Sequence, residues 1–261
     1  IFERVVICGM GGSAIAGDLA ADLAALQASG PITVIRDFHL PFKLDSKTLF
    51  IASSHSGNTE ETVSLFHQAL QSDAQVMGIT GGGVVLAEAE SQGIPHLVID
   101  APGEPRSAVG YSLMLVLGVL TRLGFMTISE SDVDCTVTAL EQQIALSRED
   151  VPADQNEAKQ LAADLVDQLV VVYGGGIFSG LARRWKTQIN ENSKARAFYE
   201  HIPELLHNSV ESYGPLNDTG KNASQDEMIV VLKPATATNE LESRYRVVLE
   251  LLGRKDVRHR V

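Results

Sequence analysis

The sequence predicts an α/β protein with two domains, each built on a parallel sheet flanked by helices. Short apolar runs alternate with helical segments along the first half of the chain, a pattern typical of βαβ units. The order of strand, glycine-rich turn and helix occurs at Val5–Gly17 and again at Val170–Leu181, which indicates a duplicated fold. The length of 261 residues is sufficient for two such domains.

The first domain is predicted over residues 1–135, with a sheet layered between helices. Its strands are the apolar runs Arg4–Cys8, Ile32–Ile35, Thr48–Ser53, Gln75–Thr80 and His96–Ile99. Its helices are one that follows the glycines after the first strand, one that begins near Thr59, one near Val85–Ser91 and a long apolar helix over Ser107–Gly124. Strands joined by helices in this way pair in parallel.

The second domain is predicted over residues 150–261. A polar helical stretch, Asp132–Glu149, and a turn at Val151–Asp154 separate it from the first domain. Its elements are a helix near Asn156–Leu165, a strand at Leu169–Tyr173 followed by a glycine turn and helix, a later strand at Met228–Leu232 and a later helix at Leu241–Leu252. The pattern of the first domain therefore starts again here.

Composition excludes several classes of partner. The 33 acidic residues outnumber the 21 basic ones and give a net charge of −12, which argues against a nucleic-acid backbone or an anionic membrane. The longest apolar stretch, Leu113–Leu120, is far shorter than the ~20 residues that cross a bilayer. Cys8 and Cys135 lack the paired Cys/His spacing of a zinc site, so we expect a reducing cytoplasm and no metal, with Cys8 in the core.

A first candidate binding turn, Gly9–Ser13, joins the first strand to the first helix. Glycines let a ligand approach the backbone, and a helix N-terminus offers unpaired N–H groups to an anion. The spacing differs from the GxGxxG of dinucleotide sites, but Asp37 after the second strand keeps NAD binding as an alternative.

A second turn is richer in hydroxyl groups. Ser54, Ser56 and Thr59 all lie where a strand gives way to a helix. The alternative is an N-cap, in which Thr59 and Thr62 or Glu61 complete the first helical turn. Because one cap needs only one hydroxyl, the cluster favours a bound phosphate monoester.

Three charged or titratable side chains are further candidates, each with a structural alternative. Arg106 could stabilise charge on a substrate oxygen, or could pair at the surface with Glu104. Glu191 could act as a base, or could be a solvated carboxylate paired with Lys194. The sequence around His207, taken alone, indicates only an ordinary histidine of a loop or helix.

Four blocks, GMGGSAIAGD, SSHSGNTEET, PRSAVGY and WKTQINENSKARAFYEHIPELLHN, occur in this order over residues 9–208. Together they resemble the bifunctional phosphoglucose/phosphomannose isomerases of the sugar isomerase (SIS) domain superfamily. The block SHSGNTEET alone indicates an SIS domain, and NEN followed by His207 narrows the resemblance to this family. His55 stands where the family has a tyrosine, and Leu206 where it has an asparagine.

The resemblance implies two flavodoxin-like SIS domains assembled as a homodimer, without a metal or another cofactor. It implies that five residues of the first two blocks bind the 6-phosphate of a hexose: Gly12, Ser13, Ser54, Ser56 and Thr59. Glu191 would move a proton between C1 and C2 of the open-chain sugar. Arg106 would stabilise the cis-enediol(ate), and His207 would assist ring opening from across the dimer interface.

Two functions follow as hypotheses. The first is an isomerase that interconverts glucose 6-phosphate and mannose 6-phosphate with fructose 6-phosphate. The alternative is a non-catalytic SIS module that binds a sugar phosphate, since only the enzyme needs Glu191, Arg106 and His207 together. An amidotransferase-type SIS unit would require a glutaminase domain upstream. The family also continues past residue 261 into a helix that carries a lysine, so we expect this chain to be shortened at its C-terminus.

Overall fold

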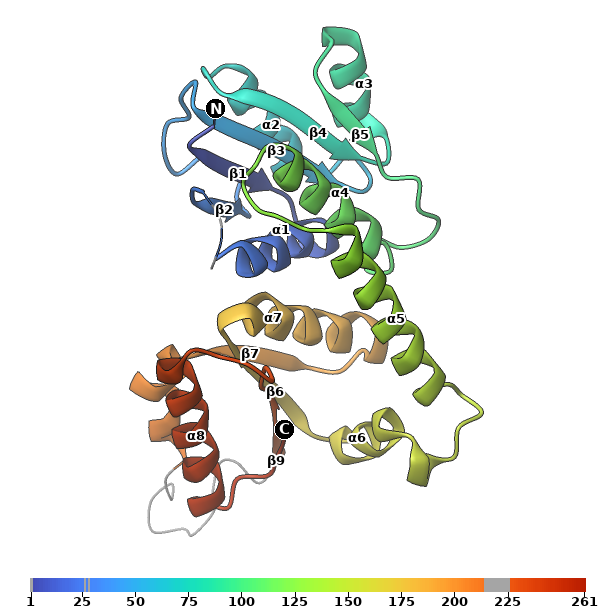
Figure 1. Cartoon of the computed structure of the whole chain (residues 1–261), viewed down its shortest axis with the longest axis vertical. Coiled ribbons are helices and arrows are strands. Elements are labelled where there is room, and N and C mark those ends of the chain that lie inside the picture. The colour runs from blue at the N-terminus through green and yellow to red at the C-terminus, as the bar shows by residue number, and fades with distance from the viewer. Residues whose placement is uncertain (1, 26, 28, 214–225) are drawn as a thin grey trace. The chain divides into compact units, whose positions relative to one another are not determined.

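Two parallel β-sheets, one in each half of the chain, organise the fold (Figure 1). The computed structural model describes residues 2–25, 27, 29–213 and 226–261. The chain divides into a first unit, Ile1–Thr127, and a second unit, Ile128–Val261. The α/β class with helix-flanked parallel sheets is confirmed, whereas the ranges 1–135 and 150–261 stay predictions of the domain boundary.

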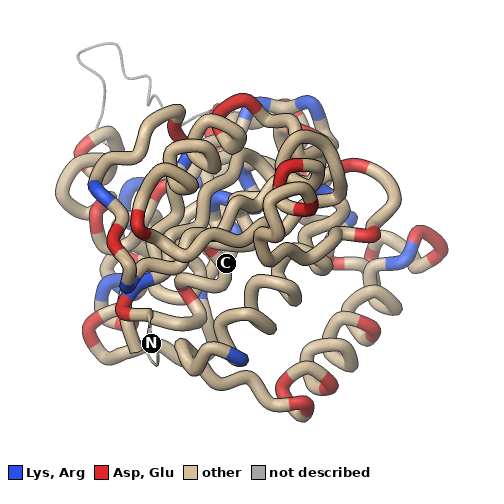
Figure 2. Tube along the Cα trace, turned by 90° about the horizontal axis from the view of Figure 1, so that it is seen from above, with Lys and Arg blue, Asp and Glu red and all other residues tan. Residues whose placement is uncertain are grey.

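Charged residues of both signs are interspersed along the described part of the trace (Figure 2). Over the whole chain, acidic residues outnumber basic ones by 33 to 21. Within the described residues, no helix is long and apolar enough to cross a membrane.

The first unit contains sheet A, five parallel strands in the order β2-β1-β3-β4-β5. The strands are β1 (Arg4–Cys8), β2 (Ile32–Ile35), β3 (Thr48–Ser54), β4 (Gln75–Thr80) and β5 (His96–Val98). The helices are α1 (Gly11–Ala24), α2 (Glu60–Leu70), α3 (Gly83–Gln92) and α4 (Val109–Arg122). From β1 the chain crosses to β2 on one side, and from β3 it crosses to β4 on the other. Right-handed crossovers therefore place α1 and α2 on opposite faces, and the strand order reverses between β1 and β3.

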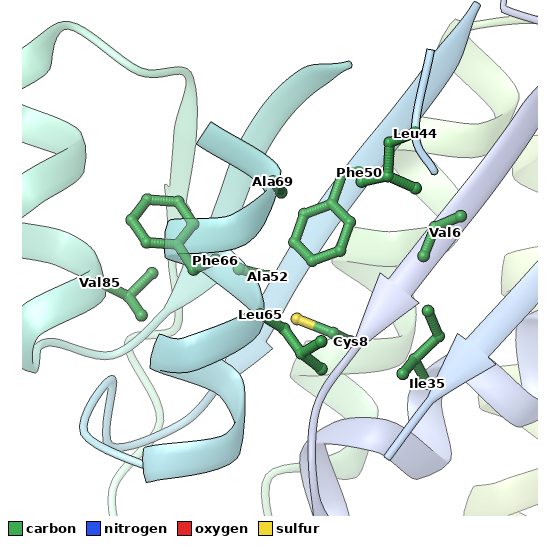
Figure 3. Close-up of a cluster of buried hydrophobic side chains, with 10 residues drawn as sticks. All are labelled: Val6, Cys8, Ile35, Leu44, Phe50, Ala52, Leu65, Phe66, Ala69 and Val85. Carbon is green, nitrogen blue, oxygen red and sulfur yellow. The ribbon is translucent and has the colours of Figure 1, made fainter. Parts of the chain in front are cut away.

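The core of the first unit fixes β1 and β3 against α2. Figure 3 shows Val6 and Cys8 of β1 beside Phe50 of β3, with Leu65 and Phe66 reaching in from α2. All these side chains are buried. Burial raises the pKa of the Cys8 thiol well above its usual range. Cys8 is therefore a core residue, as predicted, and not a reactive thiol.

The second unit contains sheet B, four parallel strands in the order β7-β6-β8-β9. The strands are β6 (Leu169–Gly175), β7 (Ala197–Ile202), β8 (Glu227–Leu232) and β9 (His259–Arg260). The helices are α5 (Glu130–Leu146), α6 (Glu157–Leu165), α7 (Ser179–Gln188) and α8 (Asn239–Arg254). The sequence did not indicate β7, because this edge strand buries only Ala197 and Ile202 and so lacks a continuous apolar run.

In sheet B the strand order reverses between β6 and β8, and a tyrosine occupies that position. The hydroxyl of Tyr245, from α8, accepts from Gly175 N at 2.8 Å and donates to Leu232 O at 2.8 Å. Tyr245 is fully buried, and burial raises its pKa to about 12. The neutral hydroxyl thus joins the carboxyl ends of β6 and β8.

We predict that Tyr245→Phe destabilises the second unit by roughly 1–3 kcal/mol, because a buried backbone N–H and a half-buried carbonyl lose their partner. Tyr111→Phe is the matched control, since Tyr111 is 53% exposed. Urea unfolding of both variants measures the effect. Equal midpoints for the two variants would show that the Tyr245 hydroxyl contributes nothing.

Candidate functional site

A cluster of hydroxyl groups lies at the carboxyl ends of β1 and β3, where the strand order of sheet A reverses. Ser13 is in the first turn of α1, and Ser54 is the last residue of β3. The Ser53 hydroxyl donates to Ser13 O at 3.1 Å, and His55 N donates to the Ser13 hydroxyl at 3.0 Å. These bonds bring the two strand ends together. In open α/β sheets, ligands bind at this reversal point.

The turn between β3 and α2 gathers the other predicted hydroxyls. The Ser54 hydroxyl accepts from Gly57 N at 3.0 Å and donates to the Thr59 hydroxyl at 3.3 Å. The Ser56 hydroxyl accepts from Asn58 N at 3.2 Å. Ser13 and Ser54 are buried, Thr59 is half-buried and Ser56 is exposed. The cluster therefore spans the range from core to surface.

The turn is held against the segment that follows β4. Gly57 has a φ of +66°, and a Cβ there would lie 1.7 Å from Gly82 O, so glycine is required. Gly57 O accepts from Val85 N at 3.1 Å, and Asn58 Oδ1 accepts from Val84 N at 3.0 Å. The hydroxyls are thus carried by a turn with fixed geometry.

Thr59 occupies the N-cap position of α2 but makes no side-chain capping bond. The alternative interpretation of this hydroxyl as a helix cap is therefore wrong. Its oxygen contacts Ser54 instead. Elsewhere in the chain a threonine does cap: Thr238 accepts from Leu241 N at 3.4 Å at the start of α8.

Arg106 lies in the turn before α4, and this turn lies against the start of α1. A Cβ on Gly12 would be 2.7 Å from Pro105 O and 3.3 Å from Arg106 N. Since Gly12 precedes Ser13, the backbone of Arg106 adjoins the hydroxyl cluster. Arg106 Nη1 also donates to Glu104 Oε2 at 3.4 Å, so the surface pair considered from the sequence does form.

Glu191 lies on a π-helical turn, η3 (Ile189–Ser193), that directly extends α7. Such wide turns are rare and often occur at functional sites. Lys194 ends the turn with a φ of +56°, and its ammonium donates to the backbone carbonyl of Glu191. The Glu191 side chain is half-buried.

Arg184 is a charged neighbour of Glu191 that the sequence interpretation missed. It is only 7% exposed; burial lowers the pKa of Arg184, and the charge of Glu191 acts in the opposite direction. Arg184 precedes Glu191 by seven positions, two helical turns, and this spacing on one helix face was the available signal. The half-buried carboxylate of Glu191 therefore has a buried guanidinium as its charged neighbour.

His207 and Glu191 are separated along the chain by β7. His207 is exposed and ends a 3₁₀ turn, η4 (Glu204–His207), that follows the carboxyl end of β7. Glu191 precedes the amino end of the same strand. The six residues of β7 span about 20 Å at ~3.3 Å per residue. The structure therefore brings six predicted residues together in the first unit: Gly12, Ser13, Ser54, Ser56, Thr59 and Arg106. In the second unit, Glu191 precedes β7 and His207 follows it.

Among the described residues, no group of three or more His, Cys, Asp or Glu side chains could hold a metal ion. The hydroxyls and backbone N–H groups of the first unit are instead suited to an anionic ligand.

The fold is shared with sugar-phosphate proteins of known structure. The C-terminal domain of glucosamine-fructose-6-phosphate aminotransferase from Francisella tularensis superposes with a TM-score of 0.70 at 17% identity, over 97% of this chain and 70% of that one. Residues 154–261 match the family described as the bacterial phospho-glucose isomerase C-terminal SIS domain. These residues therefore form a domain of the SIS class.

Two curated relatives identify the family to which the chain belongs. The bifunctional phosphoglucose/phosphomannose isomerase of Thermoplasma acidophilum is 36% identical over 97% of this chain and 73% of the relative. That of Caldicellulosiruptor bescii is 39% identical over 80% of this chain. The chain belongs to the bifunctional phosphoglucose/phosphomannose isomerase family. It spans 62% of the length of the Caldicellulosiruptor bescii protein.

We predict that Thr59→Val weakens the binding of inorganic phosphate by roughly 1–3 kcal/mol, because a hydroxyl donor is lost. Thr238→Val is the matched control: it removes a genuine cap, costing about 0.5–2 kcal/mol of stability, and leaves phosphate affinity unchanged. Calorimetric titration and urea unfolding measure the two quantities. Unchanged phosphate affinity in Thr59→Val would refute a ligand-binding role for this hydroxyl.

Proposed function

We propose that this chain is an aldose–ketose isomerase that interconverts glucose 6-phosphate and mannose 6-phosphate with fructose 6-phosphate. The observation that carries the proposal is the hydroxyl cluster at the reversal point of sheet A, in a member of this isomerase family. The relatives are named for both sugars, and the proposal extends both to this chain.

In the proposed complex the 6-phosphate binds to Ser13, Ser54, Ser56 and Thr59, with the backbone N–H of Gly12. Four of these five groups are neutral side-chain hydroxyls, which hold a phosphate without a strong ion pair. The remote phosphate fixes the position of the sugar, so that the reacting carbons stay in place while the proton moves.

Glu191 is the proposed base. In the direction from fructose 6-phosphate, its carboxylate takes a proton from C1 and returns it to C2, through a cis-enediol(ate). The buried guanidinium of Arg184 is a charged neighbour of this carboxylate. The guanidinium of Arg106 stabilises the negative charge that develops on the substrate oxygens. Return of the proton to either face of C2 gives glucose or mannose 6-phosphate.

His207 is the proposed acid–base group for opening the sugar ring. Glu191 precedes β7 and His207 follows it, and this separation favours a site to which two chains contribute. We therefore propose a homodimer in which His207 of the second copy completes each site.

We predict that Glu191→Gln abolishes isomerisation and retains phosphate binding, because the amide cannot accept the proton. Fructose 6-phosphate in D2O is followed by NMR, and wild-type protein places deuterium at C2 of newly formed glucose and mannose 6-phosphates. Glu149→Gln, an exposed glutamate of the second unit, is the matched control with wild-type turnover.

Near wild-type turnover by Glu191→Gln would refute the role of this residue. Saturable fructose 6-phosphate binding by the wild-type chain without any deuterium exchange would instead favour the non-catalytic sugar-phosphate module.

We predict that two inactive variants complement each other in mixed dimers. When Glu191→Gln and His207→Ala chains are co-expressed, half of the dimers are mixed, and each mixed dimer has one intact site. The expected activity is about a quarter of the wild-type value, for random assembly of a two-fold dimer. Activity no higher than the mean of the separate variants would show that His207 acts within its own chain.

A further inference from the structure

The backbone of the turn that carries Arg106 is in direct contact with the position of Gly12. A Cβ on Gly12 would lie 2.7 Å from the carbonyl oxygen and 2.9 Å from the carbonyl carbon of Pro105, and 3.3 Å from Arg106 N. All three neighbours are backbone atoms, so a side-chain rotation cannot relieve the overlap. Residue 12 is the second residue of α1 and is buried. The missing side chain is what allows this approach.

The turn cannot easily move away from α1. Pro105 O accepts from Ala108 N at 3.3 Å, and Glu104 O accepts from Ser107 N at 2.9 Å. Ala108 is 2% exposed at the start of α4, and α4 packs along α1. Three features therefore restrain the turn: its own hydrogen bonds, the packing of α4 on α1 and the close contact with the backbone of Gly12.

We infer that Gly12 is a positioning residue for Arg106: its lack of a side chain sets where the Arg106 guanidinium stands relative to the phosphate-binding hydroxyls. This inference depends on the proposed isomerase function, in which Arg106 stabilises the enediolate. Alanine at position 12 keeps the backbone N–H and pushes the Pro105–Arg106 peptide outward. A shift approaching 1 Å lowers kcat by roughly tenfold to a hundredfold, while KM changes little.

A first experiment reports on the turn without using activity. Trypsin can cleave the peptide bond after Arg106. For this, the turn must detach from α1 and bind in the active site of the protease. We expect Gly12→Ala to raise the rate of this cleavage at least about tenfold, in step with the loosened contact. Gly110→Ala is the matched control, because Gly110 is the second residue of α4 and a Cβ there meets nothing within 4 Å. Equal cleavage rates after Arg106 in the two variants would overturn the inference.

A second experiment is a double-mutant cycle on kcat and on the affinity for inorganic phosphate. If Gly12 acts through Arg106, Gly12→Ala lowers kcat in the wild-type background and changes it less than about twofold in an Arg106→Ala background. Because Gly12→Ala keeps the backbone N–H, its loss of phosphate affinity is expected to be smaller than its loss of kcat. An equal loss of kcat in both backgrounds, or a loss of phosphate affinity as large as the loss of kcat, would show that Gly12 acts through the hydroxyl cluster instead.

The outcomes separate this inference from the proposed function. Wild-type kcat in Arg106→Ala would refute the role of Arg106 in the reaction, yet the tryptic comparison would still show whether Gly12 holds the turn. Reduced kcat in Arg106→Ala with unchanged cleavage in Gly12→Ala would retain the proposed role of Arg106 and refute the positioning role of Gly12.

Discussion

The hydrogen bonds between Ser13 and the end of β3 join two segments that are 40 residues apart in the chain, and the candidate site depends on them. They tie the start of α1 to the turn that carries Ser54, Ser56 and Thr59. The parallel pairing of β1 and β3, with Cys8 opposite Ala52, brings both strand ends to the same edge of the sheet. The buried core below holds that pairing in register. The hydroxyl cluster is therefore a direct product of the sheet topology.

The two units share a strand topology but differ in the groups that lie at the reversal point of the sheet. Both have a first strand flanked by the second and third in chain order, and both have glycines after that first strand. In the first unit the reversal point carries hydroxyls that reach the surface, whereas in the second unit the buried hydroxyl of Tyr245 bonds to Gly175 and Leu232 across it. The charged candidate residues of the second unit lie elsewhere: Arg184 is in α7, and Glu191 is in the π-helical turn that extends it.

Much of the first unit could be predicted from the sequence, because its strands are short, mainly apolar runs that alternate with helical segments. The ranges Arg4–Cys8, Ile32–Ile35 and Gln75–Thr80 coincide with β1, β2 and β4. The edge strand β7 escaped prediction because its exposed polar residues interrupt the apolar pattern. The π-helical turn at Glu191 and the contact between Gly12 and Pro105 have no local signature either. Both depend on packing between segments, which residue order alone does not specify.

The hydroxyl character of the proposed phosphate site has a consequence for how its ligand would bind. Ion pairs with lysine weaken as ionic strength rises, whereas hydrogen bonds from hydroxyls and backbone N–H groups are little affected. A chain with a net charge of −12 repels a phosphate dianion at long range, and salt screens that repulsion within about 8 Å at physiological concentration. Added salt therefore speeds the encounter with the ligand while leaving the bound contacts intact, the reverse of the dependence that a lysine-lined pocket gives.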